Sequence, residues 1–229
     1  MRLSLPKIYV VGVGPGAHEW ITLKASSLIQ SAEYVAGFNS ALAVIEHLIR
    51  GQTITLEYGN QEAMIQRMLE LTIQGHSCVI CACGDPNVSD KQLIEKLDSK
   101  EVEVEIIPGI SSIQGACARL KIPLEETILV TFHKRGSIAE EKQQLREQAK
   151  FGQRNVIVLP RPWDFMPSDI AKFLLFEQVD PDREVTILQR VTLENESVLT
   201  YTLNELAKEE APFSDLTVII IKQSRTDKR

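Results

Sequence analysis

Three short segments rich in glycine and proline each follow an apolar, strand-like run. They are Gly12-Val13-Gly14-Pro15-Gly16, Gly84-Asp85-Pro86 and Pro108-Gly109-Ile110-Ser111-Ser112. Glycine lets ligand atoms approach bare backbone, whose N–H and C=O groups can then form hydrogen bonds. If the strands are parallel, their carboxyl ends share one edge of a sheet, where open α/β sheets bind ligands. The pattern therefore predicts one ligand crevice that all three corners line.

The first corner also matches a second, weaker pattern. Residues 12–17 fit Gly-x-Gly-x-x-Ala, a fingerprint of nicotinamide dinucleotide binding. Pro15 has no N–H to offer a pyrophosphate, and the next helix is predicted to begin only at about Thr22. The acidic residue that should follow about 20 positions later is absent from residues 34–37. These features count against a dinucleotide-dependent oxidoreductase.

Strand-like and helix-like segments alternate through the first half of the chain. The strand-like runs are continuously apolar, which is typical of a parallel sheet covered by helices on both faces. Strands are predicted over residues 7–13, 33–38, 53–56, 78–83 and 102–107, and helices over 22–31, with Thr22 as N-cap, and over 40–49, 61–74 and 90–97.

The second half of the chain is organised differently, beyond a helix that is predicted to run from just after Ser111 to about Leu120. Ser137 and Glu140 form the Ser-x-x-Glu pattern of a capping box at the start of a polar helix. The last three predicted strands have no full helix between successive pairs, which predicts a mixed sheet. Strands are predicted over residues 127–132, 155–159, 184–191, 197–202 and 216–222, with a further helix over 167–176.

The composition is that of an ordinary globular protein, with 44% hydrophobic and 24% charged residues in a chain of 229. This length suits two α/β domains. We place the first, with a mainly parallel sheet and helices on both faces, at residues 1–115. The second, with a mixed sheet, occupies 116–223, and a frayed tail occupies 224–229.

Charge and hydropathy exclude several classes of protein. The net charge of −6 argues against nucleic-acid binding, which usually needs a basic face. No apolar run approaches the roughly 20 residues that span a bilayer. Residues 1–6 lead directly into a predicted strand and leave no room for a signal peptide. We therefore expect a cytoplasmic protein with no membrane partner.

The four cysteines are Cys78, Cys81, Cys83 and Cys117. The Cys-x-x-Cys-x-Cys spacing of the first three could suggest a metal site. On one strand, however, Cys81 and Cys83 would share a face while Cys78 points to the other. We interpret them as small apolar residues of a buried strand, and we expect no bound metal.

Taken together, the three corners resemble the motifs of the tetrapyrrole methylase family, in the same order and at similar spacing over the whole chain. Val130-Thr131-Phe132-His133 and Phe213-Ser214-Asp215-Leu216-Thr217-Val218 resemble the branch that methylates carbon-5 of a precorrin. The sequence departs from the family pattern at Cys83, at Asn87-Val88-Ser89-Asp90 and at Lys134.

The resemblance implies S-adenosylmethionine as cofactor, held in a cleft between the two domains of a homodimeric methyltransferase. The implied substrate is a precorrin or cobalt-precorrin in cobalamin biosynthesis. A decarboxylating carbon-15 methyltransferase, fused to this enzyme in some organisms, would be a separate protein here. The cofactor contacts implied by position are Pro15, Cys83, Gly84, Asp85, Val88, Ser111 and Ser112, with Leu159 and Val191 from the second domain.

Methyl transfer to a ring carbon depends mainly on positioning, and a base can help to remove a proton from the product. Asp85 and His133 are the candidate bases. In the alternative interpretation, Asp85 forms a turn before Pro86, and His133 is a hydrogen-bonded histidine at a strand end.

Precorrins carry many carboxylates, and this chain is net negative, so substrate binding must rely on local cations. Lys134, Arg135 and Arg161 follow predicted strand ends and are the candidates, although each could equally be an ordinary surface charge. Two other functions stay open. One is methylation of another tetrapyrrole carbon or of a non-tetrapyrrole substrate, and the other is a non-catalytic cofactor-binding module.

Overall fold

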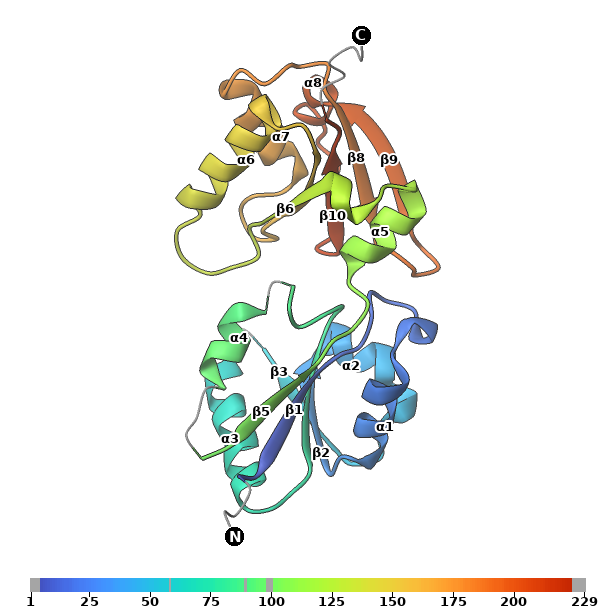
Figure 1. The fold of residues 1–229 in the computed structure, drawn as a ribbon, viewed down its shortest axis with the longest axis vertical. Helices are drawn as coiled ribbons and strands as arrows, with labels where there is room; N and C mark the ends of the chain where they lie inside the picture. The colour runs from blue at the N-terminus through green and yellow to red at the C-terminus, as the bar shows by residue number, and fades with distance from the viewer. Residues whose placement is uncertain (1–4, 58, 89, 98–100, 224–229) are drawn as a thin grey trace. The chain divides into compact units, whose positions relative to one another are not determined.

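The computed structural model describes residues 5–57, 59–88, 90–97 and 101–223. The chain divides into two compact units, Met1–Ser112 (unit 1) and Ile113–Arg229 (unit 2), shown in Figure 1. The predicted frayed tail at 224–229 lies outside the described residues. Among the residues that are described, no helix combines the length and the hydropathy needed to cross a membrane.

Unit 1 is built on a five-stranded parallel sheet in the order β3-β2-β4-β1-β5. Helices cover both faces, with α1 and α2 on one and α3 and α4 on the other (Figure 1). This confirms the predicted parallel sheet. The strands are β1 (Lys7–Gly12), β2 (Tyr34–Phe38), β3 (Gln52–Leu56), β4 (Cys78–Ala82) and β5 (Glu103–Ile107), and the helices are α1 (Leu23–Ser31), α2 (Asn39–Ile45), α3 (Gln61–Ile73) and α4 (Lys91–Lys96).

Local sequence explains where several of these elements begin and which way they face. The Thr22 side chain accepts a hydrogen bond from the Ala25 N–H at 3.2 Å and caps α1 as predicted. Cys78 and Cys81 are buried in the two clusters on opposite faces of the sheet. Cys83 does not belong to the buried strand. It follows the end of β4 and is exposed, so that part of the cysteine interpretation is wrong.

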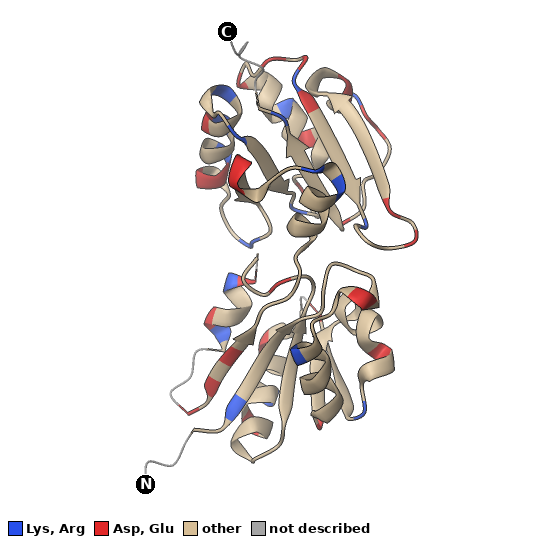
Figure 2. Ribbon diagram, turned by 45° about the vertical axis from the view of Figure 1, so that its right-hand side comes forward, with Lys and Arg blue, Asp and Glu red and all other residues tan. Residues whose placement is uncertain are grey.

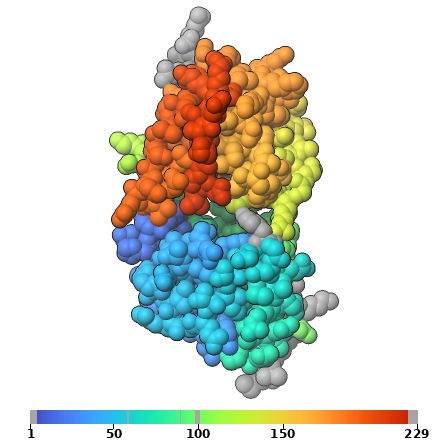
Figure 3. All heavy atoms as spheres, turned by 180° about the vertical axis from the view of Figure 1, so that it is seen from behind, coloured from blue at the N-terminus to red at the C-terminus, as the bar shows by residue number. Residues whose placement is uncertain are grey.

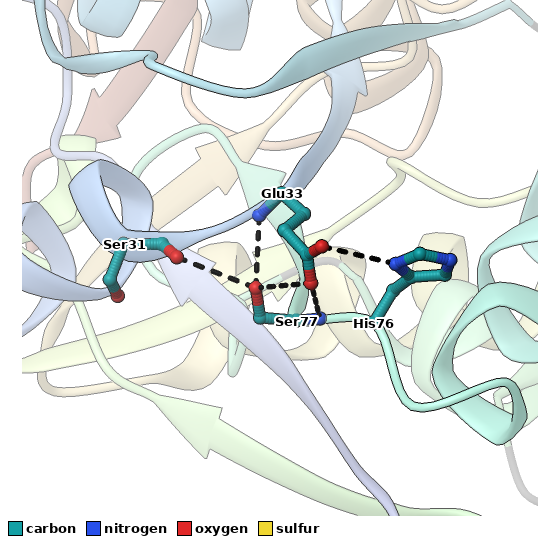
Figure 4. A network of polar contacts seen from close by, with 4 residues as sticks. All are labelled: Ser31, Glu33, His76 and Ser77. Atoms are coloured by element: carbon teal, nitrogen blue, oxygen red, sulfur yellow. Dashed lines mark hydrogen bonds and ion pairs between the residues drawn. The ribbon is translucent and has the colours of Figure 1, made fainter.

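A polar network closes the amino edge of this sheet (Figure 4). The Glu33 carboxylate accepts the Ser77 N–H at 2.8 Å and lies 3.1 Å from His76 Nδ1. The Ser77 hydroxyl in turn accepts the Glu33 N–H at 3.0 Å. The backbone hydrogen bond from Ser77 is the main cause of a lowered pKa of Glu33. The network ties together the loops that precede β2 and β4, at the edge opposite the glycine corners.

Unit 2 contains a mixed five-stranded sheet in the order β6-β7-β10-β8-β9, as predicted. Strands β6 and β7 are parallel and the other neighbours are antiparallel. The outer strand β9 lies at the surface, in the orange part of Figure 3. The strands are β6 (Thr127–Thr131), β7 (Asn155–Leu159), β8 (Glu184–Gln189), β9 (Ser197–Thr202) and β10 (Thr217–Ile221), and the helices are α5 (Ser112–Leu120), α6 (Ala139–Phe151), α7 (Pro167–Phe176) and α8 (Leu203–Leu206).

The predicted capping box of α6 is wrong. The helix starts one residue later than the pattern requires, with the N-cap at Ile138, which is buried in the core. The Ser137 hydroxyl accepts the Ala139 N–H at 3.3 Å, and the N-cap has no side-chain hydrogen bond. Burial of Ile138 therefore decides where the helix begins. In both units the charged residues lie mostly on helices and connecting loops (Figure 2).

Candidate functional site: the glycine corners and the strand ends of unit 2

The three corners of unit 1 lie side by side because β4, β1 and β5 are neighbours in the sheet. The first two corners form an isolated antiparallel bridge. The Gly84 N–H donates to the Gly14 carbonyl at 2.8 Å, and the Gly14 N–H donates back at 3.3 Å. Two loops that follow different strands are thus joined through backbone alone.

The third corner approaches the other two so closely that side chains cannot stand between them. A Cβ atom on Gly12 would lie 2.6 Å from the Gly109 nitrogen. A Cβ atom on Gly109 would lie 2.2 Å from the Gly84 carbonyl oxygen. These two glycines are therefore required for contact between backbones, whereas the sequence suggested contact with a ligand.

Gly84 is different from Gly12 and Gly109. Its φ of +69° is one that L side chains rarely adopt. A Cβ atom there would have nothing nearer than the Ser111 Cα, at 3.5 Å. A Cβ atom on Gly84 would thus be in ordinary van der Waals contact with the third corner, so glycine is favoured there by its φ and not by a clash.

Asp85 forms the turn that its sequence position suggested. Its Oδ1 accepts the Asn87 N–H at 3.0 Å and the Asn87 side-chain amide at 2.9 Å. The Val88 N–H donates to the Asp85 carbonyl at 2.8 Å. This Asx turn leaves the Asp85 side chain half-buried at the carboxyl end of β4.

Two further side chains at this corner were not assigned a role from the sequence. The Ser40 hydroxyl lies 3.3 Å from the exposed Cys83 thiol. Burial, and next the charge of Asp85, raise the pKa of Asp90 to about 7. Asp90 belongs to Asn87-Val88-Ser89-Asp90, a segment in which this chain departs from the family pattern. That departure was the one sign in the sequence that Asp90 could matter at this corner.

The remaining candidates of unit 1 lie at the same edge. Pro15 follows β1 and is half-buried, and Val88 is also half-buried. Ser111 is buried, and Ser112 is the first residue of α5. The strand order therefore brings the first-domain candidates together at the carboxyl edge of one sheet.

In unit 2 the candidates again share one edge. Strand β6 runs parallel to β7, and β7 and β8 both run antiparallel to β10, so the three point the same way. His133 follows β6, Leu159 ends β7 and Val191 follows β8. Leu159 and Val191 are both buried. Figure 1 shows these strands in the sheet of unit 2.

His133 is exposed, yet enough protein surrounds it for desolvation to lower its pKa, and Asp215 acts in the opposite direction. The lowered pKa favours the neutral imidazole, which can accept a proton. Its ring lies 6.4 Å from the ring of Trp163, at a tilt of 55°.

The three candidate cations are in different situations. Lys134 forms an ion pair with Glu141. Arg161 is buried and binds both carboxylate oxygens of Asp164, at 2.5 and 2.8 Å, and it also donates to the Gly136 carbonyl at 2.9 Å. Arg135 is exposed. The guanidinium of Arg161 thus already holds a local turn, and it would have to exchange partners to bind a substrate carboxylate.

Among the described residues, no group of three or more histidine, cysteine, aspartate or glutamate side chains could hold a metal ion. The cysteines are all free thiols.

Comparison with known proteins gives the context for this arrangement. The family model of the tetrapyrrole (corrin/porphyrin) methylases matches residues 7–207. A probable cobalt-precorrin-7 C(5)-methyltransferase of Methanocaldococcus jannaschii is 34% identical over 215 residues, covering 93% of this chain and 96% of the relative. A cobalt-precorrin-4 C(11)-methyltransferase of the same organism is 28% identical over 214 residues, covering 88% and 81%.

Solved structures share the fold. A precorrin-6Y methylase of cobalamin biosynthesis from Archaeoglobus fulgidus superposes with a TM-score of 0.72 at 24% identity, over 95% of this chain and 98% of that one. A uroporphyrin-III C-methyl transferase from Thermus thermophilus, complexed with S-adenyl homocysteine, gives 0.73 at 22% identity, over 94% and 92%. Because the family model matches residues 7–207 and a relative is matched over nearly its full length, this chain belongs to the tetrapyrrole (corrin/porphyrin) methylase family.

Proposed function

We propose that this protein transfers a methyl group from S-adenosylmethionine to carbon-5 of a precorrin or cobalt-precorrin in cobalamin biosynthesis. The observation that carries the proposal is the meeting of three corners through bare backbone at the carboxyl edge of β4, β1 and β5. The relative with 34% identity, named for methylation of carbon-5, supports the choice of ring carbon.

The corner residues suit a cofactor with both polar and apolar parts. At Gly84 the φ of +69° favours a residue without a side chain, which leaves the backbone bare, and Ser111 supplies a hydroxyl in the third corner. The proposed contacts from unit 1 are Pro15, Cys83, Gly84, Asp85, Val88, Ser111 and Ser112, and those from unit 2 are Leu159 and Val191.

S-adenosylmethionine, when bound, supplies a methyl group on a positively charged sulfur. The protein's part is to hold the acceptor carbon in line with that methyl group, which can lower a barrier by up to about 7–11 kcal/mol in the best cases. A proton must then leave the methylated ring or move within it. Asp85 and the neutral His133 are the proposed acceptors, because each side chain lies at a carboxyl strand end and is accessible or half-buried.

The direct test has two parts. We expect S-adenosylhomocysteine to bind with a dissociation constant in the micromolar range or below, measured by calorimetry. Incubation with methyl-labelled S-adenosylmethionine should then label cobalt-precorrin-7 and not cobalt-precorrin-4. Absence of cofactor binding would contradict the methyltransferase, whereas transfer to cobalt-precorrin-4 alone would contradict the choice of carbon-5. Cofactor binding without transfer to any tetrapyrrole would favour the non-catalytic module.

We expect the assembly to be a cytoplasmic homodimer that acts on the free tetrapyrrole, with a separate enzyme performing the carbon-15 methylation. The family resemblance supports this expectation. Light scattering of the purified protein should give twice the chain mass of 25.7 kDa.

The candidate cations give a prediction about substrate binding. Replacing Arg135 by glutamine should weaken the binding of a polycarboxylate substrate about ten- to a hundredfold. This is the effect of one lost charge-assisted contact of roughly 1.5–3 kcal/mol. Cofactor affinity should not change. Replacing Arg161 should instead lower the stability of the protein and weaken the binding of both substrate and cofactor, because its side chain fixes Asp164 and the Gly136 carbonyl. Measurement of both dissociation constants and of the melting temperature separates the two arginines, and equal losses from both variants would contradict this distinction.

A further inference from the structure

The turn that follows β8 has an unusual backbone. Arg190 and Thr192 have φ values of +53° and +72°, in the left-handed region. Neither is glycine, and a β-branched residue such as threonine is a genuine outlier there. Such strain persists only where the surroundings impose it, and it is concentrated at functional sites. Val191, a proposed cofactor contact, lies between these two residues.

The peptide groups of Val191 are themselves unusual. Val191 is 3% exposed. Among the described residues, none forms a hydrogen bond with its N–H or its C=O. Buried backbone groups without partners are rare, because each loses its hydrogen bonds to water and gains nothing in return. A bound molecule that pairs with one of these groups would remove that cost.

The Glu196 carboxylate contacts the turn directly. One carboxylate oxygen accepts the Thr192 N–H at 2.7 Å. The other lies 2.9 Å from Arg119 Nε, on α5. The Glu196 side chain is mostly buried, with 18% exposed, so its carboxylate has little contact with water and depends on these two donors. The carboxylate thus fixes Thr192, and with it the peptide that joins Val191 to Thr192.

Helix α5 holds the same turn from a second direction. A Cβ atom on Gly115 would lie 2.7 Å from Val191 Cγ1, so the valine side chain rests directly on the bare helix backbone. The Arg190 N–H donates to the Leu216 carbonyl at 2.8 Å, which anchors the start of the turn to the strand end beside it. Val191 is therefore held on both sides, while its own peptide groups have no hydrogen-bond partner in the part of the chain that the structure describes.

We propose that Glu196 is a positioning residue that holds the strained turn Arg190–Thr192 so that the peptide groups of Val191 face the bound cofactor. The inference rests on the proposed function, because it takes Val191 as a cofactor contact. Glu196 does not itself touch the cofactor. It acts by keeping Thr192 in a conformation that threonine otherwise avoids.

The test compares Glu196→Ala with a variant in which the turn no longer depends on Glu196. Glu196→Ala should weaken the binding of S-adenosylhomocysteine about tenfold, the effect expected for loss of one charge-assisted hydrogen bond. It should also raise KM for S-adenosylmethionine with little change in kcat. Asparagine tolerates the left-handed region far better than threonine. The double variant Glu196→Ala/Thr192→Asn should therefore recover most of the lost affinity.

Two matched controls isolate the contact. In Glu196→Gln, the amide oxygen can still accept the Thr192 N–H, so its affinity should stay close to that of the unmodified protein. Arg119→Met removes the other partner of the carboxylate, on a side chain that is 64% exposed, and should change affinity much less than Glu196→Ala.

Each outcome decides a different question. If the unmodified protein does not bind S-adenosylhomocysteine, the proposed function fails. If it binds and Glu196→Ala binds equally well, the positioning role is overturned. It is also overturned if the double variant, with an unchanged melting temperature, stays as weak as Glu196→Ala. Should Glu196→Ala fail to fold, Thr192→Asn is compared with the double variant, where equal affinities support the role and a further tenfold loss overturns it.

Discussion

Gly109→Ala should lose both cofactor binding and a large part of the free energy of unfolding. The added Cβ would lie 2.2 Å from the Gly84 carbonyl oxygen and 2.8 Å from the Gly12 Cα. Both neighbours are backbone atoms, so relief requires the corners to move apart. Overpacking of this kind costs about 1–3 kcal/mol and occasionally more. The movement would also disturb the bridge between Gly14 and Gly84, and we expect calorimetry to detect no S-adenosylhomocysteine binding.

Two other glycines serve as controls for this variant. A Cβ atom on Gly59 would meet no heavy atom within 4 Å, so Gly59→Ala should leave stability and affinity unchanged. Gly84→Ala should fold, because its nearest contact would be at 3.5 Å, although its φ of +69° makes alanine strained by roughly 1–2 kcal/mol. Denaturant unfolding of the three variants gives the comparison. A Gly109→Ala protein as stable and as tightly binding as Gly59→Ala would show that the close approach does not exist in solution.

Asp85→Asn should lower kcat by about a hundredfold or more while leaving the fold intact. Asparagine keeps a side-chain oxygen that can accept the Asn87 N–H, so the turn at this corner should survive. It removes the carboxylate that could accept a proton from the methylated ring, and general base catalysis contributes about 10²–10⁴-fold. Single-turnover methyl transfer, followed with the cofactor at saturation, measures the effect without the contribution of binding.

Comparison with Asp85→Ala separates the two possible roles of this residue. Alanine removes both the carboxylate and the turn contacts to Asn87, so it should also weaken cofactor binding. If Asp85→Asn retains full activity while Asp85→Ala loses cofactor affinity, Asp85 is a turn former alone. The acceptor of the proton would then be His133, and we would expect His133→Ala to lower kcat instead.

Local sequence was sufficient to predict most helices and strands of this protein. The continuous apolar run of β4 predicted a strand buried on both faces, because only a sheet covered by two layers of helices buries every position of a strand. The hydroxyl of Thr22 predicted the start of α1, because a cap satisfies backbone donors within one turn. Such predictions succeed where the contacts that determine an element lie within a few residues of one another. They also succeed where the spacing of apolar residues shows which positions are buried.

The chemistry of the corners needed the tertiary structure. Gly12, Gly84 and Gly109 were visible as glycines in the sequence, but their different requirements depend on strand order, which places β4, β1 and β5 side by side. Gly12 and Gly109 are required by neighbouring backbone, and Gly84 is favoured by its own φ. The sequence could not distinguish these cases, because the atoms concerned are about 25 to 100 positions apart along the chain.

The strained turn at Thr192 is the clearest case of a feature that the sequence does not record. Threonine ordinarily avoids a positive φ, so local preference predicts the opposite conformation. The carboxylate of Glu196, the close packing of Val191 on Gly115 and the tie from Arg190 to Leu216 together override that preference. The sequence by itself determined the elements and the family of this protein. Only the tertiary structure decided which backbone groups are left to bind a ligand, because that depends on contacts between segments that the chain brings together only on folding.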